Sequence, residues 1–121
     1  MKKAGYVIFI CVFLCLLCAC SQKTFNGNST GNDHQFIMEY TVLNTSDHRN
    51  LVLQSGDVID AKIVSQSGSV DIEVQNSEGE SIYKEADVPT SDFEIKISQD
   101  DTYRFTVTGH KAKGSVSFIK K

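Results

Sequence analysis

The 121-residue sequence contains no tryptophan, one proline and no cysteine beyond position 20. The absence of later cysteines excludes a disulfide-bonded fold, a cysteine zinc site and a cysteine nucleophile from residues 21–121, because each requires thiols within the folded part. The shortage of proline, together with an apolar content of 40%, excludes collagen-like and largely disordered proteins. The length predicts a single small domain.

The amino-terminal segment has the composition of a secretory signal. Two lysines follow the first residue, and residues 4–22 carry no charged side chain. A cationic start before an apolar run that ends at a small residue is typical of signal peptides. The run ends at Leu17-Cys18-Ala19-Cys20, which resembles the lipobox of bacterial lipoproteins. The resemblance implies cleavage between Ala19 and Cys20, a diacylglyceryl group on the Cys20 thiol, and acylation of its freed amino group by a fatty acid such as palmitate.

The first 35 residues are therefore expected to place the protein on the extracytoplasmic face of a bacterial cell membrane, held by a lipid anchor. Residues 1–19 form the predicted signal peptide. Residues 20–35 form a predicted flexible tether, because a stretch rich in Asn, Gly, Ser and Thr buries too little surface to order itself. Such a coil extends about 20 Å. The alternative is an uncleaved anchor over residues 4–20, whose 17 residues are at the short end of a membrane span.

The charge of the mature chain excludes one class of partner. Removal of residues 1–19 leaves 10 basic and 15 acidic side chains, a net charge of −5. This argues against nucleic acid, whose phosphates require clustered Lys and Arg. Lys111, Lys113, Lys120 and Lys121 gather near the carboxyl end, where they are interpreted as the solvated edge of a terminal hairpin. The expected partners are the membrane, through the anchor, and a protein or glycan.

Residues 36–121 show the period of β-strands. Apolar residues alternate with polar ones over residues 36–43, 51–53, 59–63, 70–75, 93–97, 103–107 and 116–118. In the first stretch, Phe36, Met38, Tyr40 and Val42 are expected to share the buried face. Alternation of this kind is typical of antiparallel strands with one buried side. The sequence thus predicts an all-β antiparallel sandwich of jelly-roll type, with seven or eight short strands, over residues 36–121.

Clusters of turn-forming residues separate these stretches. Gly, Asn, Asp and Ser favour chain reversal because Gly adopts positive φ and the others bond to their own backbone. Tyr103, at the start of a strand, is expected to form either a tyrosine corner or a plain half-buried aromatic. The predicted reversals are Ser55-Gly56-Asp57, Gln66-Ser67-Gly68, Ser77-Glu78-Gly79, Pro89-Thr90-Ser91, Gln99-Asp100-Asp101 and residues 109–114.

A family resemblance follows from motifs in these strands. The motifs are Gly56-Asp57-Val58-Ile59-Asp60-Ala61, Gly68-Ser69-Val70-Asp71-Ile72-Glu73-Val74, Gly79-Glu80-Ser81-Ile82-Tyr83 and Asp101-Thr102-Tyr103-Arg104-Phe105-Thr106-Val107. Their order resembles the GOLD (emp24-type) β-sandwich and related pre-peptidase C-terminal domains. The resemblance implies a non-catalytic interaction module, with no family catalytic residues to transfer.

The titratable residues predict neither a metal site nor a catalytic group. His34, His48 and His110 have no ligand spacing and are expected to be solvated in the tether or in turns. No G-x-S-x-G elbow or phosphate-binding loop is present. Calcium requires six to eight oxygen ligands, and the sequence lacks a D-x-D-x-D-G run, so no metal or cofactor is predicted. The candidate calcium ligands in or beside turns were Asp57, Asp60, Glu78, Glu80, Asp100 and Asp101.

These observations predict a membrane-anchored lipoprotein that acts as a non-catalytic binding or assembly module, and not an enzyme. Its sheet faces or edge strands would contact a protein or glycan. The alternative is a carbohydrate-binding or peptidase-accessory domain of a cell-surface enzyme system. Sugar binding commonly uses exposed aromatic rings, for which Tyr83 and Tyr40 are the candidates.

Overall fold

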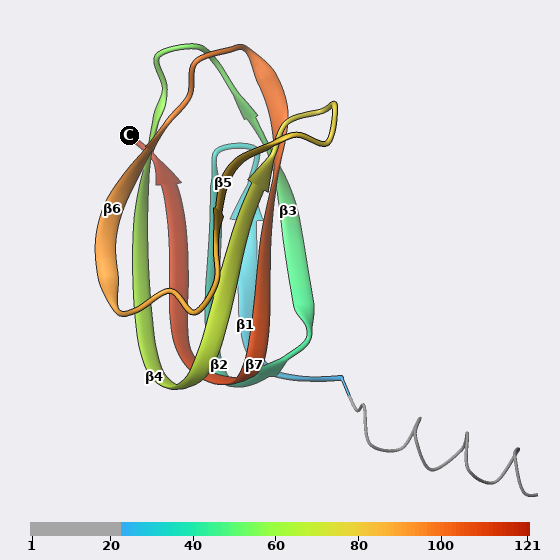
Figure 1. Cartoon of the computed structure of the whole chain (residues 1–121), viewed down its shortest axis with the longest axis vertical. Helices are drawn as coiled ribbons and strands as arrows, with labels where there is room; N and C mark the ends of the chain where they lie inside the picture. The colour runs from blue at the N-terminus through green and yellow to red at the C-terminus, as the bar shows by residue number, and fades with distance from the viewer. Residues whose placement is uncertain (1–22) are drawn as a thin grey trace, which may run out of the picture.

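The computed structural model describes residues 23–121, which form an all-β structure (Figure 1). These residues contain no helix with the length and apolarity of a membrane span. The predicted signal peptide, Ala19 and Cys20 lie outside the described residues. The strands are β1 (Thr24–Asn32), β2 (Gln35–Asn44), β3 (Ser46–Leu53), β4 (Val58–Gln75), β5 (Ser81–Glu85), β6 (Ser91–Lys96) and β7 (Asp101–Lys120).

Two long strands organise the fold. β4 has 18 residues and β7 has 20, and they pair antiparallel from Ile59 opposite Lys120 to Gln75 opposite Arg104. The first half of β4 and the second half of β7 lie in one sheet, in the order β1-β2-β7-β4-β6. The other halves lie in a second sheet, in the order β3-β7-β4-β5. The predicted antiparallel sandwich and its strand number are therefore confirmed.

Both long strands bend where the two sheets meet, and here two predicted turns are wrong. Residues 66–68 and 109–114 do not reverse the chain but lie within β4 and β7. The β4–β7 register shifts twice between Ser65 and Ser69, which is the mark of β-bulges. Residues in bulges adopt unusual backbone angles, as residues in turns do, so glycine is common in both. The glycine-rich stretches therefore have a structural role, but it is to bend the strands where the two sheets meet.

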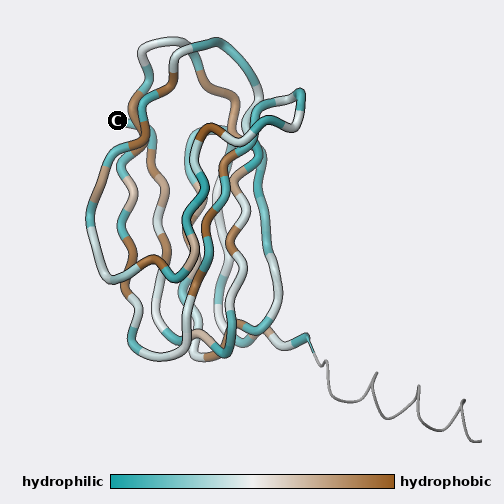
Figure 2. The backbone as a smooth tube through the Cα atoms, viewed as in Figure 1, coloured by the Kyte–Doolittle hydropathy of each residue, from teal (hydrophilic) through white to brown (hydrophobic). Residues whose placement is uncertain are grey.

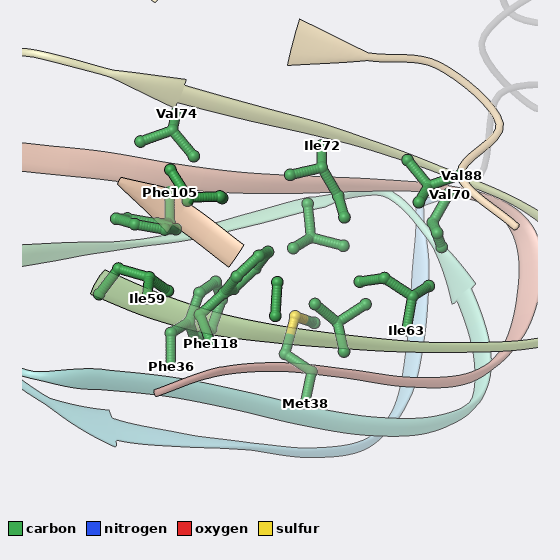
Figure 3. Close-up of a cluster of buried hydrophobic side chains, with 14 of the residues drawn as sticks. Phe36, Met38, Ile59, Ile63, Val70, Ile72, Val74, Val88, Phe105 and Phe118 are labelled. Atoms are coloured by element: carbon green, nitrogen blue, oxygen red, sulfur yellow. The ribbon is translucent and has the colours of Figure 1, made fainter. Parts of the chain in front are cut away.

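Alternating side chains from both sheets fill the space between them (Figure 3). Phe36, Phe105 and Phe118 are fully buried, and the rings of Phe105 and Phe118 lie 5.0 Å apart. Figure 2 shows the alternation as apolar and polar colours exchanging along the strands. The predicted inward position of Val42 is wrong: it is 38% exposed while Leu43 is buried, because a bulge between Tyr40 and Leu43 shifts the alternation.

The predicted flexible tether is also wrong over most of its length. Thr24–Asn32 forms β1, which pairs with β2 from Thr24 opposite Asn44 to Asn32 opposite Gln35. The folded body therefore begins about twelve residues before the predicted boundary at residue 36. The strand was invisible to periodicity because it has almost no apolar residues. Its order comes from the hydrogen-bond ladder to β2.

The two open sides of the sandwich are closed differently. Between β1 and β3, Ser29 donates to Asp47 at 2.7 Å. The guanidinium of Arg49 in β3 also lies 5.9 Å from the centre of the Phe36 ring in β2. Gly31 faces the Arg49 side chain, and a Cβ there would lie 2.7 Å from Arg49 Nε. Between β5 and β6 the closure is aromatic, with Tyr83 stacked on Phe93 at 5.4 Å.

Candidate interaction surfaces

The outer face of the second sheet is mostly polar, with Val52 of β3 and Ile82 of β5 as its exposed apolar side chains. We call it the polar face; Asn50 of β3, Arg104 of β7 and Gln75 of β4 form one row across it. A cavity of about 350 Å³ opens beside this row, and all three residues line it. Its walls offer amide, hydroxyl and guanidinium groups, which suit hydrogen bonding to a polar ligand rather than burial of an apolar one. The lining residues are Asn50, Gln75, Asn76, Ser77, Gly79, Thr102 and Arg104.

An acid–histidine pair lies on the same face. His110 Nε2 is 2.7 Å from Asp71 Oδ2, and the two side chains are 58% and 38% exposed. The backbone N–H of Asp87 also donates to Asp71, and this bond, followed by the bond to His110, holds the pKa of Asp71 below its usual value. Within residues 23–121, no hydroxyl bonds to His110. The described pair therefore lacks the nucleophile that acyl transfer requires.

Two of the three histidines are not placed where the sequence predicted them. His110 lies within β7 and is paired, whereas a solvated position in a turn was expected. His48 is exposed but lies in β3, also not in a turn. His34 lies in the short connection between β1 and β2, and its backbone N–H donates to Asn32. The three rings are therefore distributed over different parts of the fold.

Three of the candidate calcium ligands in the turns accept hydrogen bonds from backbone N–H groups instead. Asp57 accepts from the N–H of Gln54 at 2.7 Å, and Asp100 accepts from the N–H of Ser55 at 2.7 Å. Asp101 accepts from both the N–H and the hydroxyl of Ser77, and the backbone bond is the main reason that its pKa is lowered. Among residues 23–121, no three acidic, His or Cys side chains gather as a metal site would require.

Two glutamates in the β4–β5 hairpin oppose each other. The pKa of Glu78 is raised, first by a hydrogen bond with Glu80 and then by the charge of that neighbour. Two carboxylates this close repel each other when both are ionised, so each of them ionises less readily beside the other. The backbone of this hairpin is ordered by Asn76, whose side-chain oxygen accepts from the N–H groups of Glu78 and Glu80.

The tyrosines are engaged in packing. Tyr103 donates its hydroxyl to the carbonyl of Gln99 at 2.7 Å and is buried, so of the two expected arrangements the tyrosine corner is the one present. Tyr40 is 5% exposed, and burial raises its pKa to about 12. Tyr83 stacks on Phe93. Of the two rings considered for sugar stacking, Tyr40 is therefore buried in the core, and Tyr83 is partly buried against Phe93.

The edge of β1 is a surface that periodicity could not find. Within residues 23–121, β1 is the last strand of its sheet and pairs only with β2. No backbone bond outside that ladder reaches Thr24–Asn32 in the described part of the chain. About half of the N–H and C=O groups of such an edge face outward. The signal in the sequence was the run of Asn, Gly, Ser and Thr that predicted a tether.

The four carboxyl-terminal lysines do not form one patch. Lys120 lies 3.6 Å from Asp57, and Lys121 bonds to Glu94, at the end of the sandwich that holds the chain terminus. Lys111 and Lys113 lie in β7 where it faces the bend of β4, and Figure 1 shows the bends of β4 and β7 at the end of the sandwich opposite to the carboxyl terminus. Nine residues of strand separate Lys111 from Lys120, a distance of about 30 Å. Each pair therefore belongs to a different surface.

Comparison with known proteins shows a shared fold only. No protein-family model matches the sequence, and no curated protein matches it. The solved structure of PliG from Aeromonas hydrophila, a periplasmic inhibitor of g-type lysozyme, superposes with a TM-score of 0.52 at 15% identity. The match covers 74% of this chain and 89% of PliG. At this identity the likeness concerns the sandwich fold.

Two further solved structures superpose more loosely. The pre-peptidase C-terminal domain of a collagenase from Bacillus anthracis has a TM-score of 0.44 at 14% identity, over 82% of this chain and 89% of that domain. The accessory secretory protein 1, 2 and 3 structure from Streptococcus pneumoniae has a TM-score of 0.42 at 12% identity, over 79% of this chain and 85% of that chain.

Proposed function

We propose that this protein is a lipoprotein, anchored through Cys20 on the extracytoplasmic face of a bacterial membrane, whose sandwich binds an extended segment of a protein partner without catalysing a reaction. The lipobox-like Leu17-Cys18-Ala19-Cys20 supports the anchor. PliG, which has the same fold, is described as an inhibitor of another protein. That description is compatible with a binding role for this sandwich.

The open edge of β1 carries the proposal for the partner. The two sheets have four edge strands, and three of them carry charged residues that discourage the addition of another strand. β5 and β6 are also short, with 5 and 6 residues. β1 has 9 residues and no charge. The charged residues of the other edges are Asp47, Arg49, Lys84, Glu85, Asp92, Glu94 and Lys96.

The body of the fold holds residues 27–32 of β1, which follow a bulge between Asn26 and Gly27, in a regular extended shape that can accept a strand. β2 bonds to its inner edge along nearly the whole length, and Asp47 and Arg49 of β3 contact its inner face at Ser29 and Gly31. A pre-ordered strand loses little entropy when a partner pairs with it. Main-chain hydrogen bonds then supply affinity, and the side chains of the exposed residues select the partner. The uncharged side chains of β1 suit a polar, uncharged segment.

The anchor is tested by metabolic labelling with a fatty-acid analogue. We expect the full chain to carry the label and to sediment with membranes, and Cys20→Ala to lose both. A Cys20→Ala chain that stays acylated would contradict the anchor.

The partner edge is tested by photo-cross-linking in cells. A photoreactive residue replaces Thr30, which is exposed on β1, and Asp92, which is exposed on the opposite edge strand of the same sheet. We expect a protein adduct from position 30 alone. Thr30→Lys, tested with a probe at Asn28, should abolish the adduct, while Asn50→Lys on β3 should preserve it. Equal adducts from both edges, or no effect of Thr30→Lys, would rule out binding at β1.

A further inference from the structure

The end of the sandwich from which the chain leads toward Cys20 carries unpaired basic residues. Thr24 lies opposite Asn44, and the side-chain oxygen of Asn44 accepts from the N–H of Lys111. Two strand spacings therefore separate Thr24 from Lys111, a distance of about 10 Å. Lys23 and Lys113 are exposed at the same end. We call Lys23, Lys111 and Lys113 the basal lysines.

The basal lysines differ from the other carboxyl-terminal lysines in their partners. No acidic group lies within ion-pair distance of any of the three in residues 23–121, whereas Lys120 and Lys121 both form ion pairs. Lys111 is one of two non-glycine residues with positive φ, at 50°, in the described structure. This backbone angle marks the bulge at the bend of β7. The charges of the basal lysines are thus left to solvent or to an external partner.

Of the acids that stand farther up the strands from this end, Asp71 and Asp47 have partners, whereas Glu39, which lies opposite Ser115, and Asp87, whose N–H donates to Asp71, form no ion pair within residues 23–121. Asp71 lies three residues beyond Gly68, about 10 Å along β4, and is paired with His110. Asp47 accepts from Ser29 and from the N–H of His48. Asp71 and Asp47 lie about one Debye length from this end, so solvent ions weaken their repulsion of an anion bound there.

The length of the connection brings this end close to the anchor. Only Ser21, Gln22 and Lys23 lie between Cys20 and Thr24. Four residue steps reach at most about 14 Å, less than the tether of about 20 Å that the sequence predicted. Phe25, the exposed aromatic ring of β1, lies at the same end and is 39% exposed. An aromatic ring beside lysines is typical of segments that lie at a membrane interface.

We propose that this end of the sandwich, with Lys23, Lys111, Lys113 and Phe25, lies against the anionic phospholipid headgroups of the membrane that holds the anchor. The inference rests on acylation of Cys20, as proposed above. Lysines at an anionic surface add attraction that one or two acyl chains alone do not give. The contact fixes the orientation of the sandwich, so that β1 runs away from the membrane from its first residue.

The test uses the full acylated protein in vesicles. The mature chain has no other thiol than Cys20, so a single introduced cysteine can carry a fluorophore. Gln66→Cys places it on the bend of β4, and Ser98→Cys places a matched control at the opposite end; both positions are exposed. Quenching by a headgroup-labelled lipid is compared in phosphatidylcholine vesicles and in vesicles with about one third phosphatidylglycerol, where the surface is anionic.

We expect quenching at position 66 in the anionic vesicles, and little at position 98. Replacement of Lys111 and Lys113 by Gln should weaken the contact about fivefold for each lysine, and about 0.5 M salt should weaken it similarly. Lys62→Gln and Lys96→Gln together serve as a charge-matched control and should change nothing. Equal quenching at both ends, or no effect of the Lys111 and Lys113 changes, would overturn the inference.

The mass of the intact chain separates this inference from the proposed function. A chain that carries the acyl groups but shows no quenching at position 66 overturns the membrane contact and leaves the anchor intact. A chain without acyl groups overturns both.

Discussion

The two ends of the sandwich use glycine for different reasons. At the bend, Gly68 has φ +67°, and a Cβ there would lie 2.2 Å from the carbonyl oxygen of Lys111. Gly114 is equally crowded, with 1.8 Å to the carbonyl oxygen of Val64. At the opposite end, Gly56 and Gly79 also have positive φ, but no atom lies within 4 Å of a Cβ. Backbone contact dictates glycine at the bend, whereas the turn angle alone dictates it at the other end.

The ends also differ in how they use charge. At the turn end, Asp57, Asp100 and Asp101 bond to backbone N–H groups, and Lys120 pairs with Asp57. At the bend, Lys111 has no ion pair with any described residue. At the turn end these three aspartates accept hydrogen bonds from the backbone, whereas Glu78 and Glu80 oppose each other; at the bend the charge of Lys111 has no ion-pair partner among the described residues. Substitutions at the bend should therefore either lower the stability of the fold strongly or weaken an external contact. Substitutions at the turns should lower the stability by smaller, varying amounts.

The largest expected effect is that of Gly68→Ala. The new methyl group meets the backbone of β7 in a left-handed conformation, so strain and overpacking add. We expect the free energy of unfolding to fall by about 3 kcal/mol or more, measured by urea denaturation followed by circular dichroism.

Gly79→Ala is the matched control at the turn end. Only the left-handed backbone angle opposes this change, so we expect a loss of about 1 kcal/mol. If the two variants lose the same stability, crowding at the bend does not distinguish the two ends.

Tyr103→Phe tests how firmly side chains hold the turn end. The change removes the hydroxyl that donates to the carbonyl of Gln99 while keeping the buried ring. We expect the free energy of unfolding to fall by about 1 kcal/mol, the net value of one hydrogen bond. Phe105→Tyr, which adds a hydroxyl in the core, should lower the urea midpoint more than Tyr103→Phe does. A Tyr103→Phe chain as stable as wild type would show that the corner contributes packing alone.

The pH dependence of stability should separate two carboxylates at the turn end. The folded-state pKa of Asp101 is lowered by the N–H of Ser77, so its stabilising effect is present above the unfolded pKa and is lost as the pH falls below about 4. The pKa of Glu78 is raised by Glu80, so its ionisation destabilises the fold as the pH rises through that pKa.

Urea midpoints of Asp101→Asn and Glu78→Gln, measured from pH 3 to pH 7 across the range in which carboxylates titrate, check both signs. Asp101→Asn should be less stable than wild type at neutral pH, with a difference that shrinks in acid. Glu78→Gln should be more stable at neutral pH, and this gain should also vanish in acid. Parallel curves for all three chains would show that neither carboxylate is perturbed in the fold.

The smallest effect is expected for Lys121→Ala. Its ion pair with Glu94 lies on the surface, where solvent screens the attraction. We expect no measurable shift of the urea midpoint, and the same result for Lys111→Ala at the bend. A clear loss for Lys111→Ala alone would mean that this lysine has a structural role that the contacts do not show.

The sequence predicted those strands whose burial is one-sided. Leu51 and Leu53 are buried with Val52 exposed between them, as alternation requires. Tyr103 was recognisable from its place at the start of a strand. These features depend on neighbours two to four residues away, and local patterns contain that information.

β1 and the bends could not be predicted in the same way. β1 is ordered by β2 and by Asp47, which lies 18 residues after its partner Ser29. The bends are set by contacts between Gly68 and Lys111, more than 40 residues apart. Glycine signals both turns and bulges, and only the pairing of the two long strands decides between them. The open edge was missed for the same reason, since a strand must be recognised before its edge can be.

The direction of β1 limits how two copies of the protein can associate. An uncharged edge of nine residues is the kind of strand that pairs with a second copy of itself and leads to dimers or fibrils. Antiparallel pairing of two such edges would raise the first residue of one copy about 30 Å above that of the other. A chain acylated at Cys20 can bridge only about 14 Å to the bilayer. The proposed attachment to a common membrane would therefore oppose antiparallel self-pairing, so that an edge that is an aggregation hazard in a free protein could stay open for another chain.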